Sequence, residues 1–375
     1  MKITAMRTTA MILLAVLVWP PPLFGAGEGM PELWAERDRI GYPSVPRKVL
    51  TFYYPWYGNA EVTGGSGRWS HWSGVDEEKG RIASSTHYPV LGPYDSHDPK
   101  LIAQHAAWSR EAGVDGWIAS WWGHGSFSGQ ALPRLLDGAR TAGLAVTIYY
   151  ETVPGPQTPG SAAADLLRLL EAYAEHPAWL RVEGRPVVFI YGRAVGQLRL
   201  DGWLRTITLV HQKHPKPVVF VGDRISQPAA RLFDGIHTYN TAGSLRDKNV
   251  AEVRAWCREQ FPHWVTTARA RRRISTVTVI PGYDDTKIRK PGLVVPRWEG
   301  RSYRAQWEEA IAAAPDWVLV TSWNEWHEGS EIEPSREYGH RYLEVTAQMS
   351  ARFKSLAPHN SPTSPKEAGQ GGTVR

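Results

Sequence analysis

The sequence contains a single cysteine, Cys257, among its 375 residues. One cysteine excludes every disulfide within the chain, and with it a fold that depends on disulfides for stability. Cys257 follows Trp256 in a segment with helical periodicity, where a buried and unreactive thiol is the expected state. The fold must therefore rest on a hydrophobic core, and hydrophobic residues make up 42% of the chain, enough for a large one.

Long apolar runs are missing as well. After the N-terminal region no segment has eighteen consecutive apolar residues, which excludes a membrane-spanning helix there. At the N-terminus, basic residues precede the short apolar run Met11–Trp19, and small residues follow at Gly25–Gly27, as in an export signal. We predict a signal peptide or N-terminal anchor at residues 1–26 and an exported protein, periplasmic or secreted. The phenylalanine and prolines before Gly25 are unusual near a cleavage site, so an uncleaved anchor is the alternative.

A strong excess of charge of one sign is also absent, because the net charge is only +6. Basic residues cluster at Arg269–Arg273, but a solvated helix end accounts for this cluster. No nucleic-acid-binding pattern accompanies it, so we expect no nucleic-acid partner. Residues 358–375 are polar and rich in proline and glycine, and we predict that they form a disordered tail. The protein is expected to be a monomer.

What the sequence does contain is eight short apolar segments that alternate with longer segments of helical periodicity, as in repeated βαβ units. The predicted strands are Lys48–Tyr54, Val114–Ser120, Ala145–Glu151, Pro186–Tyr191, Pro217–Gly222, Gly235–Tyr239, Val277–Pro281 and Trp317–Trp323. We therefore predict an α/β fold, a single (β/α)8 TIM barrel over residues 45–357 with a long insertion between its first strand and first helix. The residues expected to open helices are Asp98, Thr158, Asp201, Asp247 and Ser302. Only the stretch Ser226–Leu232 is too short for a full-length helix.

Polar and aromatic side chains follow the apolar part of the predicted strands. They include Tyr54, Trp56, Trp121, Glu151, Tyr191, Asp223, Tyr239, Tyr283 and Trp323. In a TIM barrel these strand ends build the active site. The chain also has eighteen tryptophans and fifteen tyrosines against eight phenylalanines. Such rings stack on the apolar faces of sugars while their polar atoms reach hydroxyl groups, so a carbohydrate ligand is expected.

The segment Thr321–Glu333 is the part of the chain richest in reactive groups, with four glutamates between tryptophans. Burial raises the pKa of a carboxyl group, and a raised pKa is what a general acid needs near neutral pH. Glycosidic cleavage usually employs two carboxylates, and Glu325 and Glu328 are the predicted pair. If the chain turns after Asn324 the two side chains lie close together, and if it stays extended they separate. The hypothesis fails if either acid points away from the barrel mouth or is bound by an arginine beneath it.

The other acids have competing interpretations. Glu151 either binds a sugar hydroxyl or forms a buried ion pair with an arginine such as Arg193. Glu331 and Glu333 are expected to pair with Arg336 or Arg341. Asp284 and Asp285 lie next to Lys287 and Arg289, where ion pairs that stabilise the loop are the competing interpretation.

Several blocks of the sequence resemble glycoside hydrolase family 99, the endo-α-mannosidase family. The blocks are TFYYPWYGN at Thr51–Asn59, WSHW at Trp69–Trp72, LGPYDSHDP at Leu91–Pro99, PGYDDTKIR at Pro281–Arg289 and SWNEWHEGSEIEP at Ser322–Pro334. Together they span most of residues 48–350. The resemblance implies a TIM barrel and a retaining, endo-acting hydrolase of α-mannosidic linkages in glycans or polysaccharides.

The resemblance also implies a role for particular residues. Glu325 would deprotonate the 2-hydroxyl group of the substrate, which attacks C1 to give a 1,2-anhydro sugar. Glu328 would act as general acid and then as base for water. Glu151 and Tyr239, with Tyr54 and His71, match contacts to the reacting sugar. Further predicted contacts, taken from the strand ends, are Trp56, Trp121, Tyr283, Trp323, Asn324 and Trp326.

Two segments depart from the family pattern. Trp122–Gly125 reads WGHG where the family commonly has tyrosine and proline, and the residues after Tyr239 lack the expected phenylalanine and glycine-serine pattern. Both should line outer subsites, so the glycan and its linkage stay open. No metal and no cofactor are predicted, because the histidines are scattered and form no ligand motif. Two other functions remain as alternatives, a non-catalytic carbohydrate-binding barrel and a transglycosylase of polysaccharide assembly.

Overall fold

The computed structural model describes residues 29–42 and 45–356 of the chain. Within these residues all eight predicted strands are present and form one closed, parallel barrel, because the last strand pairs back onto the first. In barrel order they are β1 Lys48–Tyr53, β4 Gly116–Trp121, β5 Ala145–Tyr150, β7 Arg185–Ile190, β8 Val219–Asp223, β9 Gly235–His237, β10 Ile274–Val279 and β13 Trp317–Val320. The signal peptide or anchor predicted at residues 1–26 and the tail predicted at residues 358–375 lie outside the described residues.

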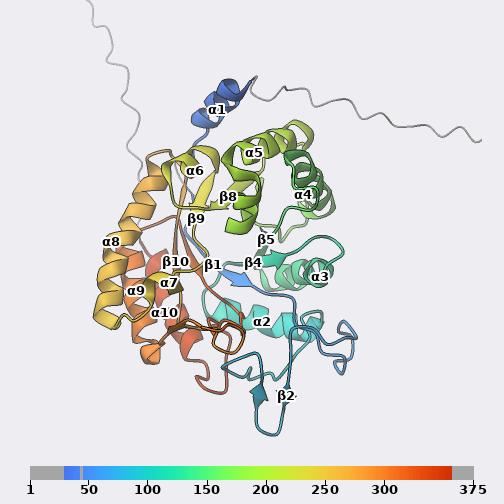
Figure 1. The fold of residues 1–375 in the computed structure, drawn as a ribbon, viewed down its shortest axis with the longest axis vertical. Helices are drawn as coiled ribbons and strands as arrows, with labels where there is room; N and C mark the ends of the chain where they lie inside the picture. The colour runs from blue at the N-terminus through green and yellow to red at the C-terminus, as the bar shows by residue number, and fades with distance from the viewer. Residues whose placement is uncertain (1–28, 43–44, 357–375) are drawn as a thin grey trace, which may run out of the picture.

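Helices connect consecutive strands and surround the barrel, as Figure 1 shows. They are α2 Pro99–Glu111, α3 Phe127–Ala142, α4 Pro159–Tyr173, α5 Gly192–Lys213, α6 Gln227–Leu232, α8 Val250–Arg269, α9 Arg301–Ala313 and α10 Arg341–Lys354. The (β/α)8 TIM barrel is thereby confirmed. The short helix expected after the fifth strand is α6, with 6 residues. Among the described residues, no helix has both the length and the apolar character needed to cross a membrane.

Several shorter helices and strands accompany those of the barrel. They are α1 Met30–Arg39, α7 Ala242–Leu245, the 3-10 helix Trp298–Gly300, the hairpin of β2 Val75–Asp76 and β3 Arg81–Ile82, β6 Arg181–Val182 beside β7, and the hairpin of β11 Tyr283–Asp284 and β12 Val294–Val295. The predicted insertion is residues 54–98, between β1 and α2, and its hairpin extends away from the barrel in Figure 1.

The helix starts were predicted correctly only in part. Asp98 and Thr158 cap α2 and α4 through their side chains, as expected. Asp201 lies inside α5, which begins at Gly192 but is divided by the non-helical Arg199, so Asp201 lies in the first turn of the second helical segment. Asp247 does not cap α8, because Asn249 accepts the first N–H groups of that helix. Ser302 lies within α9, which begins one residue earlier.

Alternate residues of each strand face the barrel interior and the surrounding helices. On β1, Leu50 and Phe52 pack inside the barrel, whereas Val49 and Tyr53 pack against the helices. Trp317 and Tyr149 help to fill the interior, and both are buried. Because side chains fill the barrel, a ligand that approaches its strands must bind beyond their ends.

Candidate active site

The segment after β13 makes a turn that carries both predicted catalytic acids. The Trp326 N–H donates to the Asn324 carbonyl at 3.0 Å, so the chain does not continue in extended form. The Asp284 N–H donates to the Glu328 carbonyl at 2.7 Å, which ties this turn to the loop after β10. Of the two conformations considered, the turn brings Glu325 and Glu328 close together.

Glu325 is 3% exposed, and its surroundings favour the protonated acid. Burial raises its pKa well above the usual range, and repulsion by Glu328 raises it further. His327 donates its backbone N–H to Glu325 Oε1 at 3.1 Å, and its Nδ1 lies 3.7 Å from the same oxygen. Burial lowers the pKa of His327, so its imidazole is neutral near pH 7 and supplies no positive charge. Glu325 can therefore hold a proton near neutral pH.

Glu328 is held by groups on two other loops. The Tyr239 hydroxyl donates to Oε2 at 3.2 Å, and two nitrogens of Arg289 donate to Oε1, each at 3.2 Å. Burial raises the pKa of Glu328, and hydrogen bonds from Tyr283 and Arg289 oppose that rise without cancelling it. A carboxyl group with a raised pKa meets the requirement for a general acid near neutral pH.

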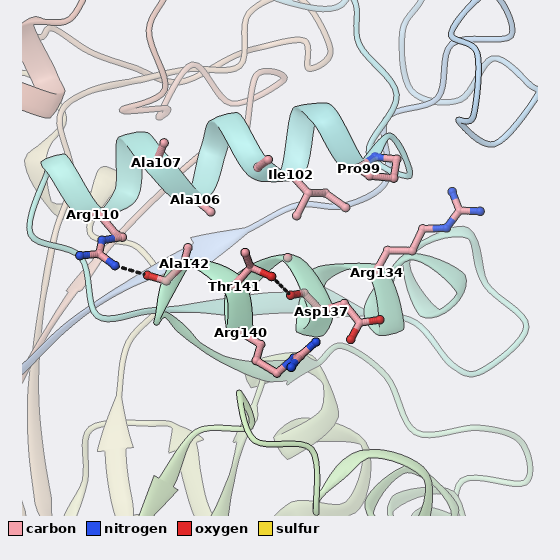
Figure 2. A pocket seen from close by; sticks show the side chains of 12 residues that line it. Pro99, Ile102, Ala106, Ala107, Arg110, Arg134, Asp137, Arg140, Thr141 and Ala142 are labelled. Atoms are coloured by element: carbon pink, nitrogen blue, oxygen red, sulfur yellow. Dashed lines mark hydrogen bonds between the residues drawn. The ribbon is translucent and has the colours of Figure 1, made fainter.

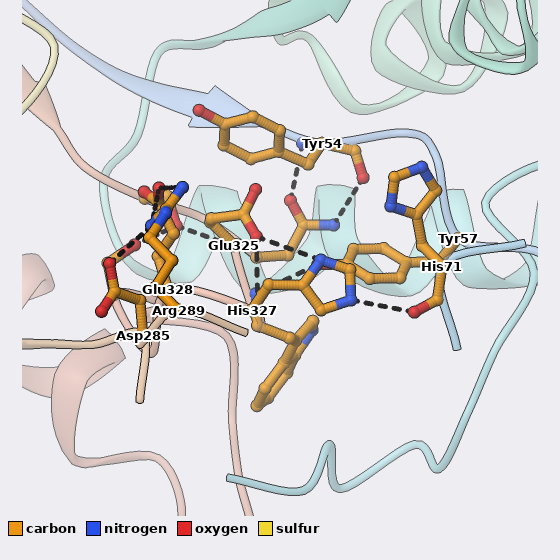
Figure 3. Close-up of polar contacts among 12 residues, drawn as sticks. Tyr54, Tyr57, His71, Asp285, Arg289, Glu325, His327 and Glu328 are labelled. Carbon is orange, nitrogen blue, oxygen red and sulfur yellow. Dashed lines mark hydrogen bonds and ion pairs between the residues drawn. The ribbon is translucent and has the colours of Figure 1, made fainter. Parts of the chain in front are cut away.

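Arg289 does not block Glu328 from beneath. The Arg289 side chain is 50% exposed and also binds Asp285 at 2.6 Å, so it lies at the rim of the mouth. The Glu328 side chain keeps 14% of its surface exposed. Figure 3 shows Arg289 and Asp285 beside Glu328, with Glu325 next to it and His327 on the far side of Glu325. The ion pair between Asp285 and Arg289 is the loop-stabilising contact considered from the sequence.

Two further acids lie near the same mouth, Glu151 after β5 and Asp223 at the end of β8. The Ser120 hydroxyl donates to Glu151 at 2.8 Å, and burial raises the pKa of Glu151 to about 8. Among the described residues Arg193 forms no ion pair with Glu151, although its charge lowers the pKa of this acid. Asp223 accepts the Tyr239 N–H at 3.2 Å, and burial raises its pKa to about 6. Asp223 therefore positions the tyrosine that binds Glu328.

Replacing Glu151 with glutamine should stabilise the fold at high pH and change it little at low pH. The pKa of Glu151 rises from 4.5 to about 8 on folding, so the folded state favours the protonated acid. That contribution is complete below pH 4.5 and is lost as the pH rises through 8. Thermal unfolding between pH 5 and 9 should show that Glu151→Gln has a larger free energy of unfolding than the parent. This difference should grow with pH, to at most about 5 kcal/mol.

The matched control is Glu171→Gln, which removes an exposed carboxylate on α4 and should change the free energy of unfolding by no more than about 0.5 kcal/mol. If Glu151→Gln behaves like this control, Glu151 is ionised in the folded protein and the electrostatic description above is wrong.

Aromatic and imidazole rings lie beside Glu325. Trp56 stacks on His71 with ring centres 4.7 Å apart and planes 3° apart, and packs against Tyr54 at 4.6 Å. His327 Nε2 donates to the His71 carbonyl at 2.8 Å. The predicted contacts Tyr54, Trp56 and His71 are thus brought together next to the predicted base, and Figure 3 shows Tyr54 and His71 on this side of the site.

Four predicted sugar contacts are instead buried below the mouth: Trp121, Trp323, Asn324 and Trp326 are each at most 2% exposed. Trp121 and Trp323 belong to the core between barrel and helices. Trp326 donates its indole N–H to the Tyr94 hydroxyl at 2.9 Å. In this structure they support the site and do not line it. Strand alternation turns Trp121 toward the core, and the turn after β13 does the same for the other three.

Asn324 joins the first and last barrel segments. Its Oδ1 accepts the Tyr54 N–H at 2.7 Å, and its Nδ2 donates to the Tyr54 carbonyl at 3.1 Å. One side chain thus satisfies both backbone groups of Tyr54. The neighbouring Glu325 is thereby fixed relative to β1.

Glu331 is buried in an ion pair that the sequence did not suggest. Its Oε1 lies 2.6 Å from Arg297 Nη2 and 2.8 Å from His87 Nδ1. Arg297 also donates to the carbonyls of Gly329 and Glu331 at 3.0 and 2.9 Å. Arg297 therefore holds the chain directly after Glu328.

Glu333 is buried as well, and its predicted pairing with Arg336 or Arg341 was wrong. It binds His105 Nε2 at 3.1 Å and accepts the Tyr94 hydroxyl at 2.8 Å. Neither arginine contacts Glu333 among the described residues. Closeness in sequence did not predict the partner of Glu333, because the chain turns this side chain inward toward α2.

Sequence reasoning gave no catalytic-site role to His327 or Arg289, which contact the two acids. His327 was considered only as one of several scattered histidines, and Arg289 only as a partner for the aspartates near it. The available signal for His327 was its position between two glutamates on a turn. For Arg289 the sequence held no such signal, because its contact with Glu328 depends on how two loops pack.

A separate groove of about 550 Å³ lies between α2 and α3, on the outside of the barrel. Ile102 and Ala106 contribute to its apolar floor, and Arg110, Arg134 and Asp137 lie along it (Figure 2). Asp137 is the one carboxylate that lines it, so this groove lacks the pair that glycosidic cleavage uses. Among the residues that the structure describes, no three histidine, cysteine or acidic side chains are grouped to hold a metal ion.

Comparisons with known proteins agree with the fold. The family model of glycosyl hydrolase family 99 matches residues 45–353. The glycoprotein endo-alpha-1,2-mannosidase-like protein of Danio rerio is 28% identical over 354 residues, which cover 84% of this chain and 77% of that protein. The glycoprotein endo-alpha-1,2-mannosidase of Mus musculus is 26% identical, over 87% of this chain and 80% of that protein. The solved structure of the GH99 endo-alpha-mannosidase from Bacteroides thetaiotaomicron superposes with a TM-score of 0.68 at 26% identity, covering 83% of this chain and 99% of that one.

Proposed function

Because the chain belongs to glycosyl hydrolase family 99 and is a glycoside hydrolase, we propose that it cleaves α-mannosidic linkages within glycans or polysaccharides and retains the anomeric configuration. The observation that carries the proposal is the turn after β13, where Glu325 and Glu328 are both buried and both have raised pKa values. The relatives named as endo-alpha-mannosidases support the mannosidic linkage and endo action.

In the proposed first step Glu325 takes the proton of the 2-hydroxyl group, and this oxygen attacks C1. The bond from C1 to the leaving oxygen breaks while Glu328 gives that oxygen its proton. A buried base with a raised pKa suits this step, since a sugar hydroxyl is a weak acid. The product is a 1,2-anhydro sugar and the released part of the glycan.

In the proposed second step Glu328, now ionised, takes a proton from water as the water attacks C1. The bond from C1 to O2 breaks, and O2 recovers its proton from Glu325. Arg289 and Tyr239 supply hydrogen bonds that stabilise ionised Glu328 during this step. Two inversions at C1 leave the configuration retained.

The proposed first step requires that Glu328 is protonated and Glu325 is ionised. In the free enzyme Arg289 pairs with Glu328 and favours its ionised form, whereas no arginine or lysine in the described part of the chain lies within 4.0 Å of the Glu325 carboxyl group. The first step needs the opposite arrangement, so the proton must pass from Glu325 to Glu328 when substrate binds. The two acids are then expected to titrate as a pair and to give one bell-shaped pH profile.

An α-linked mannan and the purified protein test the proposal. We expect oligosaccharides whose new reducing ends are in the α-form when first observed by proton NMR. Release of mannose alone would show exo action, and β-anomers formed first would show inversion. A protein that binds the mannan without cutting it would be the carbohydrate-binding alternative, and products longer than the substrate would identify a transglycosylase.

A further inference from the structure

Arg193, in the first turn of α5, lies at the rim of the same mouth, because α5 follows directly after the end of β7. Its guanidinium carbon lies 4.9 Å from the centre of the Trp122 ring and 5.7 Å from that of Tyr191. Arg193 is exposed, and Trp122 is 36% exposed. Two aromatic rings thus hold the cation at the solvent-facing edge of the site.

The N–H groups of Arg193 are not used within the described part of the chain. A guanidinium that lies over an aromatic ring is held through its face, which leaves its N–H groups free to donate. Among the described residues no carboxylate lies within 4.0 Å of Arg193 and no acceptor receives a hydrogen bond from it. Arg289, by contrast, donates to both Asp285 and Glu328. Arg193 is therefore a fixed cation whose donors are available to a ligand.

Arg193 borders the catalytic centre through two chains of contacts. The Trp122 indole N–H donates to Ser120 Oγ at 3.1 Å, and Ser120 in turn donates to Glu151. On the other side the Tyr191 ring lies 6.2 Å from the ring of Tyr239, which binds Glu328. A group bound to Arg193 would therefore lie beside the reacting sugar.

The charges of the mouth indicate what such a group must be. Glu151, Asp223, Glu325 and Glu328 are all acidic. Of these acids, Asp223 and Glu328 are the ones ionised near neutral pH, because the pKa of Asp223 is about 6 and Arg289 favours ionised Glu328. A neutral sugar therefore needs no added cation, and an anionic one would be repelled. An unpartnered arginine at the rim removes that repulsion for one negative charge and offers two parallel N–H donors to it. A carboxylate matches this geometry and charge, whereas a dianionic phosphate would call for a second cation.

We propose that the sugar next to the reacting one carries a carboxylate, as in a uronic acid, and that Arg193 binds it. The inference rests on the proposed function, because it assigns the substrate class of that same site. It also gives a role to Trp122, which lies in the segment where the sequence departs from the family pattern.

Three forms of one polymer test the proposal: an α-mannan, the same mannan with part of its primary hydroxyls oxidised to carboxylates, and the oxidised sample reduced back to the alcohol. The ratio of kcat/KM for the oxidised form to that for the reduced form measures recognition of the acid. Arg193→Gln should lower this ratio by about tenfold to a hundredfold, the usual worth of a charged hydrogen bond. Arg193→Lys should retain part of it, because it keeps the charge and loses the paired donors.

The control variant is Arg140→Gln, which removes an equal charge from an exposed arginine in the last turn of α3, at the opposite end of the barrel. It should leave the ratio as in the parent. Equal ratios in Arg193→Gln and the parent contradict the inference. A 6-phosphorylated mannan that is preferred over the oxidised one also contradicts it, because the bound group would then be a phosphate.

Failure of the proposed function gives a different result. If the parent cleaves none of these polymers, the proposed function is wrong. Dissociation constants of the parent and of Arg193→Gln for the same polymers then test the role of Arg193 without any measurement of cleavage. Binding of the oxidised mannan that is stronger than binding of the reduced form, and that is lost in Arg193→Gln, then still supports the inference. Equal binding of both forms contradicts it.

Discussion

Replacing Glu328 with glutamine should lower kcat/KM on α-mannan by about 10² to 10⁴-fold, and much of this loss should disappear on a mannosyl fluoride substrate. Glutamine keeps the size of the side chain and cannot supply a proton. Fluoride departs without one, so the first step no longer needs Glu328. The second step, in which Glu328 activates water, should then limit kcat on the fluoride, and added azide should raise kcat because azide has no proton to lose.

Glu325→Gln should behave differently, with the same large loss on mannan and on the fluoride. The 2-hydroxyl group still has to lose its proton whichever group departs. Glu299→Gln, an exposed change in the 3-10 helix before α9, is the matched control and should leave both rates unchanged. If the fluoride rescues Glu325→Gln and not Glu328→Gln, the roles of the two acids are reversed. If neither change slows the enzyme, this pair is not catalytic.

Replacing Arg297 with methionine should destabilise the fold by about 3 to 5 kcal/mol, which is the usual cost of leaving one partner of a buried ion pair. Glu331 is 1% exposed and would lose the cation 2.6 Å from its carboxylate. Two carbonyls of the turn would also lose their donor, so kcat should fall together with stability. Urea unfolding of the parent and the variant, with activity measured on the same samples, checks both effects.

The double variant Arg297→Met with Glu331→Leu separates the ion pair from the packing around it. Removing both charges should restore part of the lost stability, because no unpaired charge stays buried while the two carbonyls still lack their donor. If the double variant loses as much as the two single changes added together, the residues contribute independently and the ion pair between them has little effect.

The barrel could be predicted from the sequence because its strands are mostly apolar and its helices are amphipathic, and both patterns are local. The strand ends were less certain. The last strand stops at Val320, three residues before the predicted end at Trp323, since a turn begins there. The first residue of a helix was predicted correctly where one suitable capping side chain precedes the helix, as Asp98 does for α2. It was misplaced where two such side chains lie close together, as Asp247 and Asn249 do before α8.

For the site, the sequence identified residues that carry chemistry and did not show which way they point. Tyr54 and Trp326 look alike as aromatic residues at strand ends, yet one lies beside the mouth and the other beneath it. The difference arises after the strands end, because Tyr54 follows β1 directly whereas Trp326 lies in the turn that follows Asn324. Partners from distant loops, such as Arg297 for Glu331, depend on tertiary packing and have no local signature.

The two hydrogen bonds between Asn324 and Tyr54 join residues 270 positions apart in the chain. The segment with Tyr54 leaves the ribosome long before the one with Glu325, so the growing polypeptide holds this contact and both proposed catalytic acids only after the eighth strand has been made. A fragment that ends before the eighth strand should likewise be inert, however well its other strands assemble. For the same reason, two fragments of the chain that are expressed separately, with the break in an exposed loop, should regain activity only after they associate.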